Sequence, residues 1–265
     1  MFDKPTLKVY FNEFDYPEEL RSLIDLYPII STKKIDRDWW KKMKSSVKIF
    51  LSQNNPEFKT QSATLKYCPA IYDFINYGYT VPAWQDFQFY IDDQGEIECI
   101  TPPSMPVKPH LAPADQIDTC PIMGDTASEV VKLVSPWLID SPKGFSTIFC
   151  KPFYHYSNDF DVCPGILDTD VNEAPNKIVN VFLRFNVKNK VIKIDAGQPL
   201  LQLIPFKRMN WTLSIEKPNE KLKKMFKMIR IWENSRVEGW KKNEKESLTK
   251  NRVQENKKFE EKCPR

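Results

Sequence analysis

Five short runs of β-type residues between positions 130 and 206 constrain the fold of this chain most strongly. The runs are Val130 to Val134, Phe145 to Cys150, Val179 to Phe185, Val191 to Ile194 and Leu200 to Phe206. Pro, Gly, Asn or Asp separates each run from the next, and several short strands at such spacing are typical of a sandwich or a barrel. The sequence therefore predicts a mainly β fold.

Upstream of these runs, an alternating segment predicts a β-hairpin. Phe87, Phe89 and Ile91 recur at every second position, residues 92–95 (DDQG) supply a turn, and Ile97 begins a return strand. Six prolines then fall within residues 102–121, which we interpret as an extended surface loop rather than as a domain boundary.

Short helices are expected near the N-terminus and a long one at the C-terminus. Residues 17–27 and 69–77 read as short helices, the second ended by Gly78. From residue 216 onward the apolar residues recur mostly at three- and four-residue steps, which predicts one apolar stripe. The stripe consists of Leu222, Met225, Phe226, Ile229, Trp232 and Trp240. We expect it to dock on the body or on another subunit, with Trp232 buried.

The charge of the chain is unevenly distributed. Residues 216–265 carry 16 Lys and Arg against 9 Glu, a net charge of +7, whereas the whole chain carries +4. The remainder is therefore close to −3. Lys and Glu alternate beyond residue 240, which favours a solvated helix over a nucleic-acid contact, because a nucleic-acid surface is expected to be more one-signed.

These patterns together predict one β-rich domain over residues 1–215 and a basic helix over residues 216–265. Within the domain, residues 1–125 would form an α/β portion and residues 126–215 the barrel core. Six cysteines without a CxxC pair, and the lack of a secretory signal, predict free thiols in a cytoplasmic protein. Since no run approaches 20 apolar residues, we expect no membrane span.

Polar residues between, within and just after these strand regions are the candidate site residues. Asp168 and Asp170 stand two positions apart, so they share a face in a strand or cap backbone N–H groups in a turn. Gln202 interrupts an apolar strand and must find a hydrogen-bond partner across the barrel or face a cavity. Lys207 and Arg208 follow that strand, where solvation and phosphate contact both remain open.

A metal site built from histidine is a weaker hypothesis. The chain has two histidines, His110 and His155, and a two-His-one-carboxylate iron site would need both of them together with Asp159 or Asp161. A Gly-rich phosphate loop is absent from the sequence, which argues against P-loop and Rossmann nucleotide sites.

Residues 145–208 resemble the trimeric dUTPase and dCTP deaminase superfamily. The resemblance lies in residues 165–170 (GILDTD), in Asn186 at the end of the next strand, and in residues 197–204 (GQPLLQLI). It implies a β-clip, which is a distorted jelly-roll barrel, and a homotrimer with sites between subunits. It also implies that Asp168 activates water and that Gln202 contacts phosphates, with Asp170, Lys207 and Arg208 as further ligand residues and Mg²⁺ entering through bound phosphates.

The chain departs from that superfamily at several positions. Val171 stands where the family has a deoxyribose-packing Tyr, and residues 141–144 (SPKG) only loosely match its Arg-Ser-Gly phosphate motif. A Lys-rich segment replaces the Gly-rich C-terminal arm, and residues 181–186 (VFLRFN) lack the deaminase's catalytic Glu. These differences predict that the chain does not hydrolyse dUTP efficiently.

A second resemblance covers the whole chain. Residues 67–71 (YCPAI), 82–86 (PAWQD), 135–137 (SPW) and 195–211 are similar to an uncharacterised family of marine tailed phages. This resemblance implies a phage protein, located in the host cytoplasm or in the virion.

Two hypotheses of function follow from these patterns. One is a β-clip module that binds a nucleotide or a similar small anion, and the other is a non-enzymatic structural or interaction protein that assembles through the barrel. Asp168 separates the two: lining a cavity would favour the first, and capping a turn inside a subunit interface would favour the second.

Overall fold

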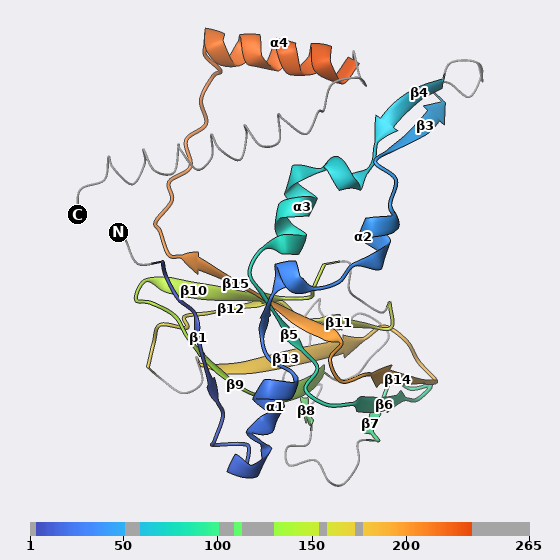
Figure 1. The fold of residues 1–265 in the computed structure, drawn as a ribbon, viewed down its shortest axis with the longest axis vertical. Helices are drawn as coiled ribbons and strands as arrows, with labels where there is room; N and C mark the ends of the chain where they lie inside the picture. The colour runs from blue at the N-terminus through green and yellow to red at the C-terminus, as the bar shows by residue number, and fades with distance from the viewer. Residues whose placement is uncertain are drawn as a thin grey trace. The chain divides into compact units, whose positions relative to one another are not determined.

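The computed structural model describes residues 4–50, 59–100, 109–112, 130–153, 158–172 and 177–234. Spatial contacts divide the chain into two units. One unit, here called the body, comprises Met1–Arg37 and Ala70–Trp211, and the second unit comprises Asp38–Pro69 and Thr212–Arg265. The α-helices and most strands of both are labelled in Figure 1.

Two larger antiparallel sheets and one smaller sheet make up the body. The first has the order β1-β9-β13-β11, with β8 also paired to β9, the second has the order β12-β10-β15-β5-β2, and the third has the order β14-β6-β7. The strands of the first sheet are β1 (Lys8–Phe11), β8 (His110–Ala112), β9 (Val130–Asp140), β11 (Phe160–Val162) and β13 (Ile178–Phe185). Those of the second are β2 (Ile30–Ser31), β5 (Tyr79–Pro82), β10 (Phe145–Cys150), β12 (Gly165–Leu167) and β15 (Pro199–Lys207). Those of the third are β6 (Phe87–Ile91), β7 (Ile97–Cys99) and β14 (Lys190–Ile194).

The core of the body consists of apolar side chains at every second position of these strands, which point to the interior. In β6 the burial pattern alternates strictly, as the period of two in the sequence predicts. Trp84 and Trp137 belong to this core and are almost fully buried, and their rings lie 5.4 Å apart and nearly perpendicular to each other. Edge-to-face aromatic pairs of this kind stabilise a core beyond the area that they bury. Trp137 is thus a core residue of the body.

Short helices complete the body. They are the 3₁₀ helices η1 (Glu18–Leu20) and η2 (Thr32–Lys34) and the α-helices α1 (Ser22–Leu26) and α3 (Pro69–Asn76), the last of which starts in the second unit. Gly78 follows α3 with a φ of +77°, a conformation that glycine adopts without strain. An added Cβ there would lie 2.1 Å from the backbone oxygen of Leu203, so this residue also allows α3 to approach β15. Both predicted N-terminal helices are confirmed.

The described residues of the second unit form a two-stranded hairpin and two α-helices, together with one short 3₁₀ helix. These elements are α2 (Asp38–Lys42), β3 (Ser46–Phe50), β4 (Lys59–Ala63), the 3₁₀ helix η3 (Leu65–Tyr67) and α4 (Glu220–Asn234). Thr64 ties the hairpin to its flank, because its hydroxyl donates to the carbonyl of Lys44 at 2.6 Å. Trp39 and Trp40 form a perpendicular ring pair 5.4 Å apart.

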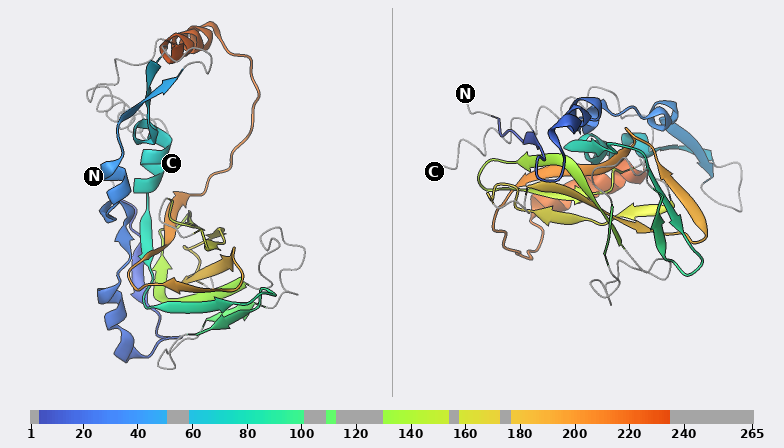
Figure 2. Two further views of the ribbon diagram at one scale, coloured as in Figure 1. Left: turned by 90° about the vertical axis from the view of Figure 1, so that its right-hand side faces the viewer. Right: turned by 90° about the horizontal axis from the view of Figure 1, so that it is seen from below.

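Between β15 and α4 the chain contains neither helix nor strand, and Figure 2 draws it as a coil. We call residues 209–216 the arm. Its apolar side chains alternate with polar ones and are exposed to solvent: Met209 by 56%, Trp211 by 85%, Leu213 by 90% and Ile215 by 92%. Within α4, the apolar residues of the expected stripe are 39–52% exposed. The side chains of residues 230–234, which include Trp232, lie outside the described ones, as do residues 235–265.

The prediction of a mainly β fold is confirmed, and each of the five β-type runs forms a strand. Within the described ranges the strands form separate sheets, not a closed barrel. Most of the proline-rich segment lies outside the described residues, but residues 110–112 within it form β8 and pair with β9. The boundary expected at residue 215 remains a prediction.

Two smaller expectations can be compared with the described residues. Cys68 and Cys150 are free thiols, and burial raises the pKa of Cys150. Where the structure describes the chain, no helix combines the length and apolar character that crossing a bilayer requires.

Candidate functional site

Asp168 and Asp170 both lie in the turn that follows β12. The backbone N–H of Val171 donates to the carbonyl of Asp168 at 3.1 Å, which closes this turn. Between the two acids, Thr169 is fully buried, and its hydroxyl lies 2.7 Å from that of Ser141 and 3.0 Å from that of Thr147. This buried hydroxyl cluster fixes the turn against β10, so the two carboxylates have defined positions.

The carboxylate of Asp170 is bound on two sides by the chain itself. Arg208 donates to both of its oxygens, from Nη1 at 2.8 Å and from Nη2 at 2.6 Å. The backbone N–H of Gly144 donates to Oδ2 at 2.7 Å. These hydrogen bonds, Arg208 first, lower the pKa of Asp170 to about 2. With 5% of its side chain exposed, Asp170 ties together the β9–β10 turn, the turn after β12 and the end of β15.

Asp168 takes part in the same group of residues but is more open to solvent. Its Oδ1 accepts from the hydroxyl of Ser146 at 2.6 Å and lies 3.0 Å from Nη1 of Arg208, while 52% of the side chain is exposed. Arg208 also donates to the hydroxyl of Ser146 at 3.0 Å and to the carbonyl of Phe145 at 3.2 Å. We call Gly144, Ser146, Asp168, Asp170 and Arg208 the Arg208 cluster.

The Arg208 cluster has the composition of an anion-binding site. The Arg208 guanidinium and the Gly144 N–H are its donors, and the anion that they bind is the Asp170 carboxylate of the same chain. A guanidinium that binds a carboxylate through two parallel hydrogen bonds makes one of the strongest charge-assisted contacts in proteins. Gly144 lies in residues 141–144, the segment that loosely matches a phosphate motif, and its N–H meets Asp170. The two carboxylates in turn raise the pKa of the Arg208 guanidinium.

Gln202 lies elsewhere in the body. It is 1% exposed on β15, and its Nε2 donates to the carbonyls of Phe74 at 3.0 Å and Tyr77 at 2.9 Å. These carbonyls belong to the C-terminal end of α3 and the residue after it, where helix carbonyls lack intrahelical partners. Oε1 of Gln202 has no hydrogen-bond partner among the described residues. Gln202 therefore joins α3 to β15, and its amide donors do not meet Asp168.

Lys207 is the last residue of β15 and is exposed, opposite Phe145 in the register of β10 and β15. The structure thus brings Asp168, Asp170 and Arg208 together, with Lys207 adjacent in sequence, and separates Gln202 from them. Among the described residues, no group of three or more His, Cys, Asp or Glu is arranged to hold a metal ion. His110 lies in β8, and His155 is outside the described residues.

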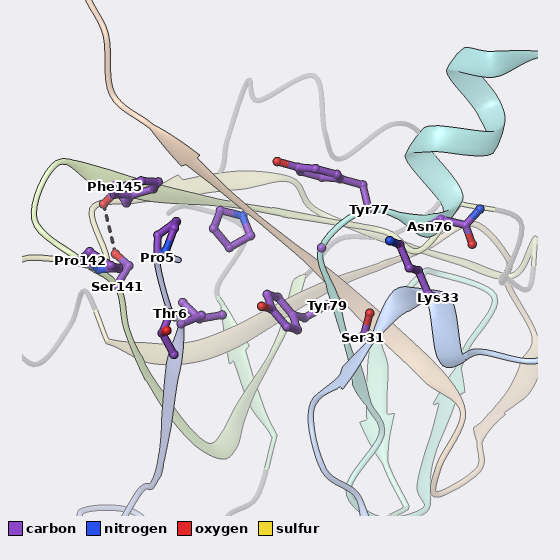
Figure 3. Close-up of a pocket in the computed structure, with 13 residues that line it drawn as sticks. Pro5, Thr6, Ser31, Lys33, Asn76, Tyr77, Tyr79, Ser141, Pro142 and Phe145 are labelled. Carbon is purple, nitrogen blue, oxygen red and sulfur yellow. Dashed lines mark hydrogen bonds between the residues drawn. The ribbon is translucent and has the colours of Figure 1, made fainter. Parts of the chain in front are cut away.

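A pocket of about 440 Å³ opens on the same body, and neither Asp168 nor Gln202 is among the residues that line it. Figure 3 shows Pro5, Thr6, Ser141, Pro142 and Phe145 on one side of it and Ser31, Lys33, Tyr77 and Tyr79 on the other. Three aromatic residues and three prolines are among the thirteen residues of the lining, and Lys33 is its charged residue. The position of Phe145 makes the pocket a neighbour of the Arg208 cluster, because its carbonyl accepts from Arg208 and from the hydroxyl of Ser141 at 3.3 Å.

Comparison of the sequence with protein-family models and with curated proteins finds no match. The two resemblances that the sequence suggests therefore rest on the residues quoted for them.

Sequence reasoning missed the role of Ser146 and of the pocket residues. Ser146 precedes an apolar strand core and carries no motif of its own. A signal for the pocket did exist, since two tyrosines flank Gly78, but nothing in the sequence shows that Pro5 and Phe145 lie close to them.

Proposed function

We propose that this protein is a non-enzymatic assembly component that associates with further copies of itself. The observation that supports this most directly is that Asp170 and Arg208 neutralise each other within the chain, and that Asp168 is bound by the same guanidinium. Residues that would have to bind a phosphate or activate water instead hold a turn and a strand end together.

Competition makes phosphate binding at the Arg208 cluster unfavourable. A phosphate would have to displace the Asp170 carboxylate, which is tethered next to its partner and so acts at a high effective concentration. Because the pKa of Asp170 is about 2, this competing anion stays charged at every physiological pH. The water-activating role that the dUTPase resemblance implies for Asp168 would likewise need Gln202 nearby, and Gln202 is bound to the end of α3.

The proposal fits the architecture and the phage resemblance. Antiparallel sheets with a common apolar core are compatible with a β-clip or a jelly-roll-like body, and folds of this type serve as scaffolds for binding and assembly without a fixed chemistry. In the phage setting, the assembly would form in the host cytoplasm or become part of the virion, as a trimer if the superfamily's symmetry is kept.

A second candidate function is the binding of a nucleotide or another small anion in the 440 Å³ pocket. It is favoured by Lys33, which lines this pocket together with Tyr77 and Asn76. A tyrosine ring can stack on a base, an ammonium can meet a phosphate, and Mg²⁺ would enter with the phosphates. In this case the anion would contact Lys33 and not the Arg208 cluster.

Two measurements on the full-length protein separate the candidates. Sedimentation velocity across a hundredfold concentration range should show an oligomer, whereas a thermal-shift screen of nucleotides and sugar nucleotides with Mg²⁺ should show no stabilisation. Asp168→Asn should leave both results unchanged. A monomer at all concentrations would refute the assembly proposal, and a nucleotide-dependent shift lost in Lys33→Ala would establish the second candidate. Hydrolysis of dUTP at about 1 per second or faster, abolished in Asp168→Asn, would show that the chain is an enzyme.

A further inference from the structure

We propose that the arm docks on a second copy of this chain and that its Trp211 inserts into the 440 Å³ pocket of that copy. This inference rests on the proposed assembly function and specifies the surface through which copies associate. Each chain would donate one arm and accept one, so that the contact repeats identically around a closed oligomer.

The arm has the alternating apolar and polar pattern of a segment that buries one of its faces. Met209, Trp211, Leu213 and Ile215 alternate with Asn210, Thr212, Ser214 and Glu216. In an extended chain, alternate side chains point to the same side, so the four apolar residues form one stripe. A stripe of this kind is typical of a strand with one buried face, yet within the described part of the chain the arm pairs with no strand. The stripe therefore lacks the cover that its pattern predicts.

The pocket matches an aromatic side chain in chemistry and in size. Pro5, Pro142, Phe145 and Tyr79 provide apolar and aromatic walls, and about 440 Å³ lies within the range of small-ligand pockets. A buried indole also needs an acceptor for its N–H, and the hydroxyl of Ser31 on the same lining can provide one. Trp211 is the arm residue that such a pocket fits best.

Position relates the arm to the pocket. The backbone N–H of Arg208 donates to the carbonyl of Gly144 at 2.8 Å, and its side chain donates to the carbonyl of Phe145, a pocket residue. Arg208 thus fixes the start of the arm beside the pocket, and Trp211 follows only three residues later. Since Trp211 is 85% exposed in a single chain, it does not occupy its own pocket. When an arm and its receptor lie side by side on every copy, exchange between copies needs no rearrangement of the body.

Charge favours a second copy as the occupant. Residues 216–265, which directly follow the arm's apolar stripe, carry a net charge of +7, and the rest of the chain is close to −3. A basic segment on one copy is therefore attracted to the body of the next, which steers the arm toward it. Lys33 lines the pocket of the accepting copy, and Glu216 at the end of the incoming arm carries the opposite charge.

Full-length variants test the contact by their association state. Trp211→Ala removes the inserting ring, and Phe14→Ala is its matched control, because Phe14 is 81% exposed on the same body but belongs to neither arm nor pocket. Thr6→Trp fills the pocket from within. We expect Trp211→Ala and Thr6→Trp to raise the dissociation constant of the oligomer at least tenfold in sedimentation velocity, and Phe14→Ala to leave it unchanged.

Photo-crosslinking identifies the receptor. A photoreactive phenylalanine at position 211 is introduced into ¹⁵N-labelled chains, which are mixed with unlabelled Trp211→Ala chains and irradiated. Mass spectrometry should find crosslinks between heavy and light chains at residues 5–7, 77–79 or 141–145. Crosslinks confined to heavy chains, within one molecule, would overturn the exchange, and so would crosslinks between chains at any other place.

The outcomes separate this inference from the function on which it rests. If the wild-type protein is oligomeric and Trp211→Ala is equally oligomeric, the arm contact is wrong and the assembly function stands. If the wild-type protein is a monomer, both fail. A labelled peptide of residues 208–217 supplies an independent measurement: it should bind Trp211→Ala protein, and failure to do so, or equal binding by a peptide with Ala at position 211, would overturn the insertion.

Discussion

Replacing Gln202 distinguishes a buried structural amide from a phosphate ligand. In the structure its Nε2 donates to the carbonyls of Phe74 and Tyr77 at 3.0 and 2.9 Å, and the side chain is 1% exposed. Gln202→Met keeps the shape and removes both donors. Each neutral hydrogen bond contributes about 0.5–1.5 kcal/mol, and loss of the orphaned Oε1 offsets part of this. We expect a net loss of about 1–2 kcal/mol in the free energy of unfolding.

Gln202→Glu should be more damaging and should depend on pH. An ionised carboxylate would face two carbonyl oxygens without solvent, and an uncompensated buried charge costs about 3–5 kcal/mol. Burial and the two carbonyls raise the pKa of this carboxyl in the folded state above its unfolded value near 4.3. Its protonated form can still donate one hydrogen bond, so the variant is most stable below the unfolded pKa and loses stability as the pH rises through the folded pKa.

Thermal unfolding followed by circular dichroism measures both effects. For a domain of this size a change of 1 kcal/mol shifts the Tm by roughly 2–4 °C, so Gln202→Glu should unfold at least about 6 °C below the wild type at pH 7. Gln88→Met and Gln88→Glu are the matched controls, because Gln88 is a half-buried strand residue on β6. If the Gln202 and Gln88 variants unfold at the same temperature at pH 5 and pH 7, the assignment of Gln202 as the link between α3 and β15 is wrong.

Two further predictions concern the turns around the Arg208 cluster and α3. Because the folded-state pKa of Asp170 is lowered to about 2, the stability that Asp170 provides over Asp170→Asn should be complete above about pH 4 and decline as the pH falls toward 2; urea titrations at pH 7, 4 and 2.5 check this, and a constant difference would contradict it. Gly78→Ala should cost more than about 3 kcal/mol, since its Cβ would overlap a backbone oxygen at 2.1 Å, whereas Gly144→Ala, also at positive φ but with open space around it, should cost about 1–2 kcal/mol. Equal melting temperatures for the two alanine variants would refute that reasoning.

The sequence predicted the strands that carry their own pattern. β9, β10, β13, β14 and β15 contain long apolar or alternating runs, and β6 with β7 has a turn signal between its strands. β2 and β12 are two and three residues long, too short for any periodicity, and they exist because longer neighbours pair with them. The β3–β4 hairpin was missed because KTQSA has no apolar alternation.

The candidate site was predictable in three of its members, Asp168, Asp170 and Arg208, but not in Ser146 and not in its chemistry. Local spacing left a shared strand face and a turn open for the two acids, and the alternative in which they bond to backbone N–H groups in a turn describes Asp170. That Arg208, 38 residues later in the chain, would neutralise Asp170 depends on the register of β10 with β15, which sequence periodicity does not specify. The partners of Gln202 are more than 120 residues away in sequence and were equally beyond reach.

The Arg208 cluster and the arm are parts of one arrangement along the chain. Arg208 is the residue through which β15 ends and the arm begins, and it is held there by its backbone N–H on Gly144 and by its side chain on Asp170. If the end of β15 served only to terminate a sheet, it would not need the ion pair between Arg208 and Asp170, because fraying of an exposed strand end costs a domain little stability. A fixed end is useful where the segment that follows must leave in a defined direction, and the segment that follows is an apolar stripe with Trp211 three residues away. The residue that resemblance would assign to a phosphate thus anchors the start of the arm on the body, and in the proposed assembly this anchor would direct the arm to the neighbouring copy.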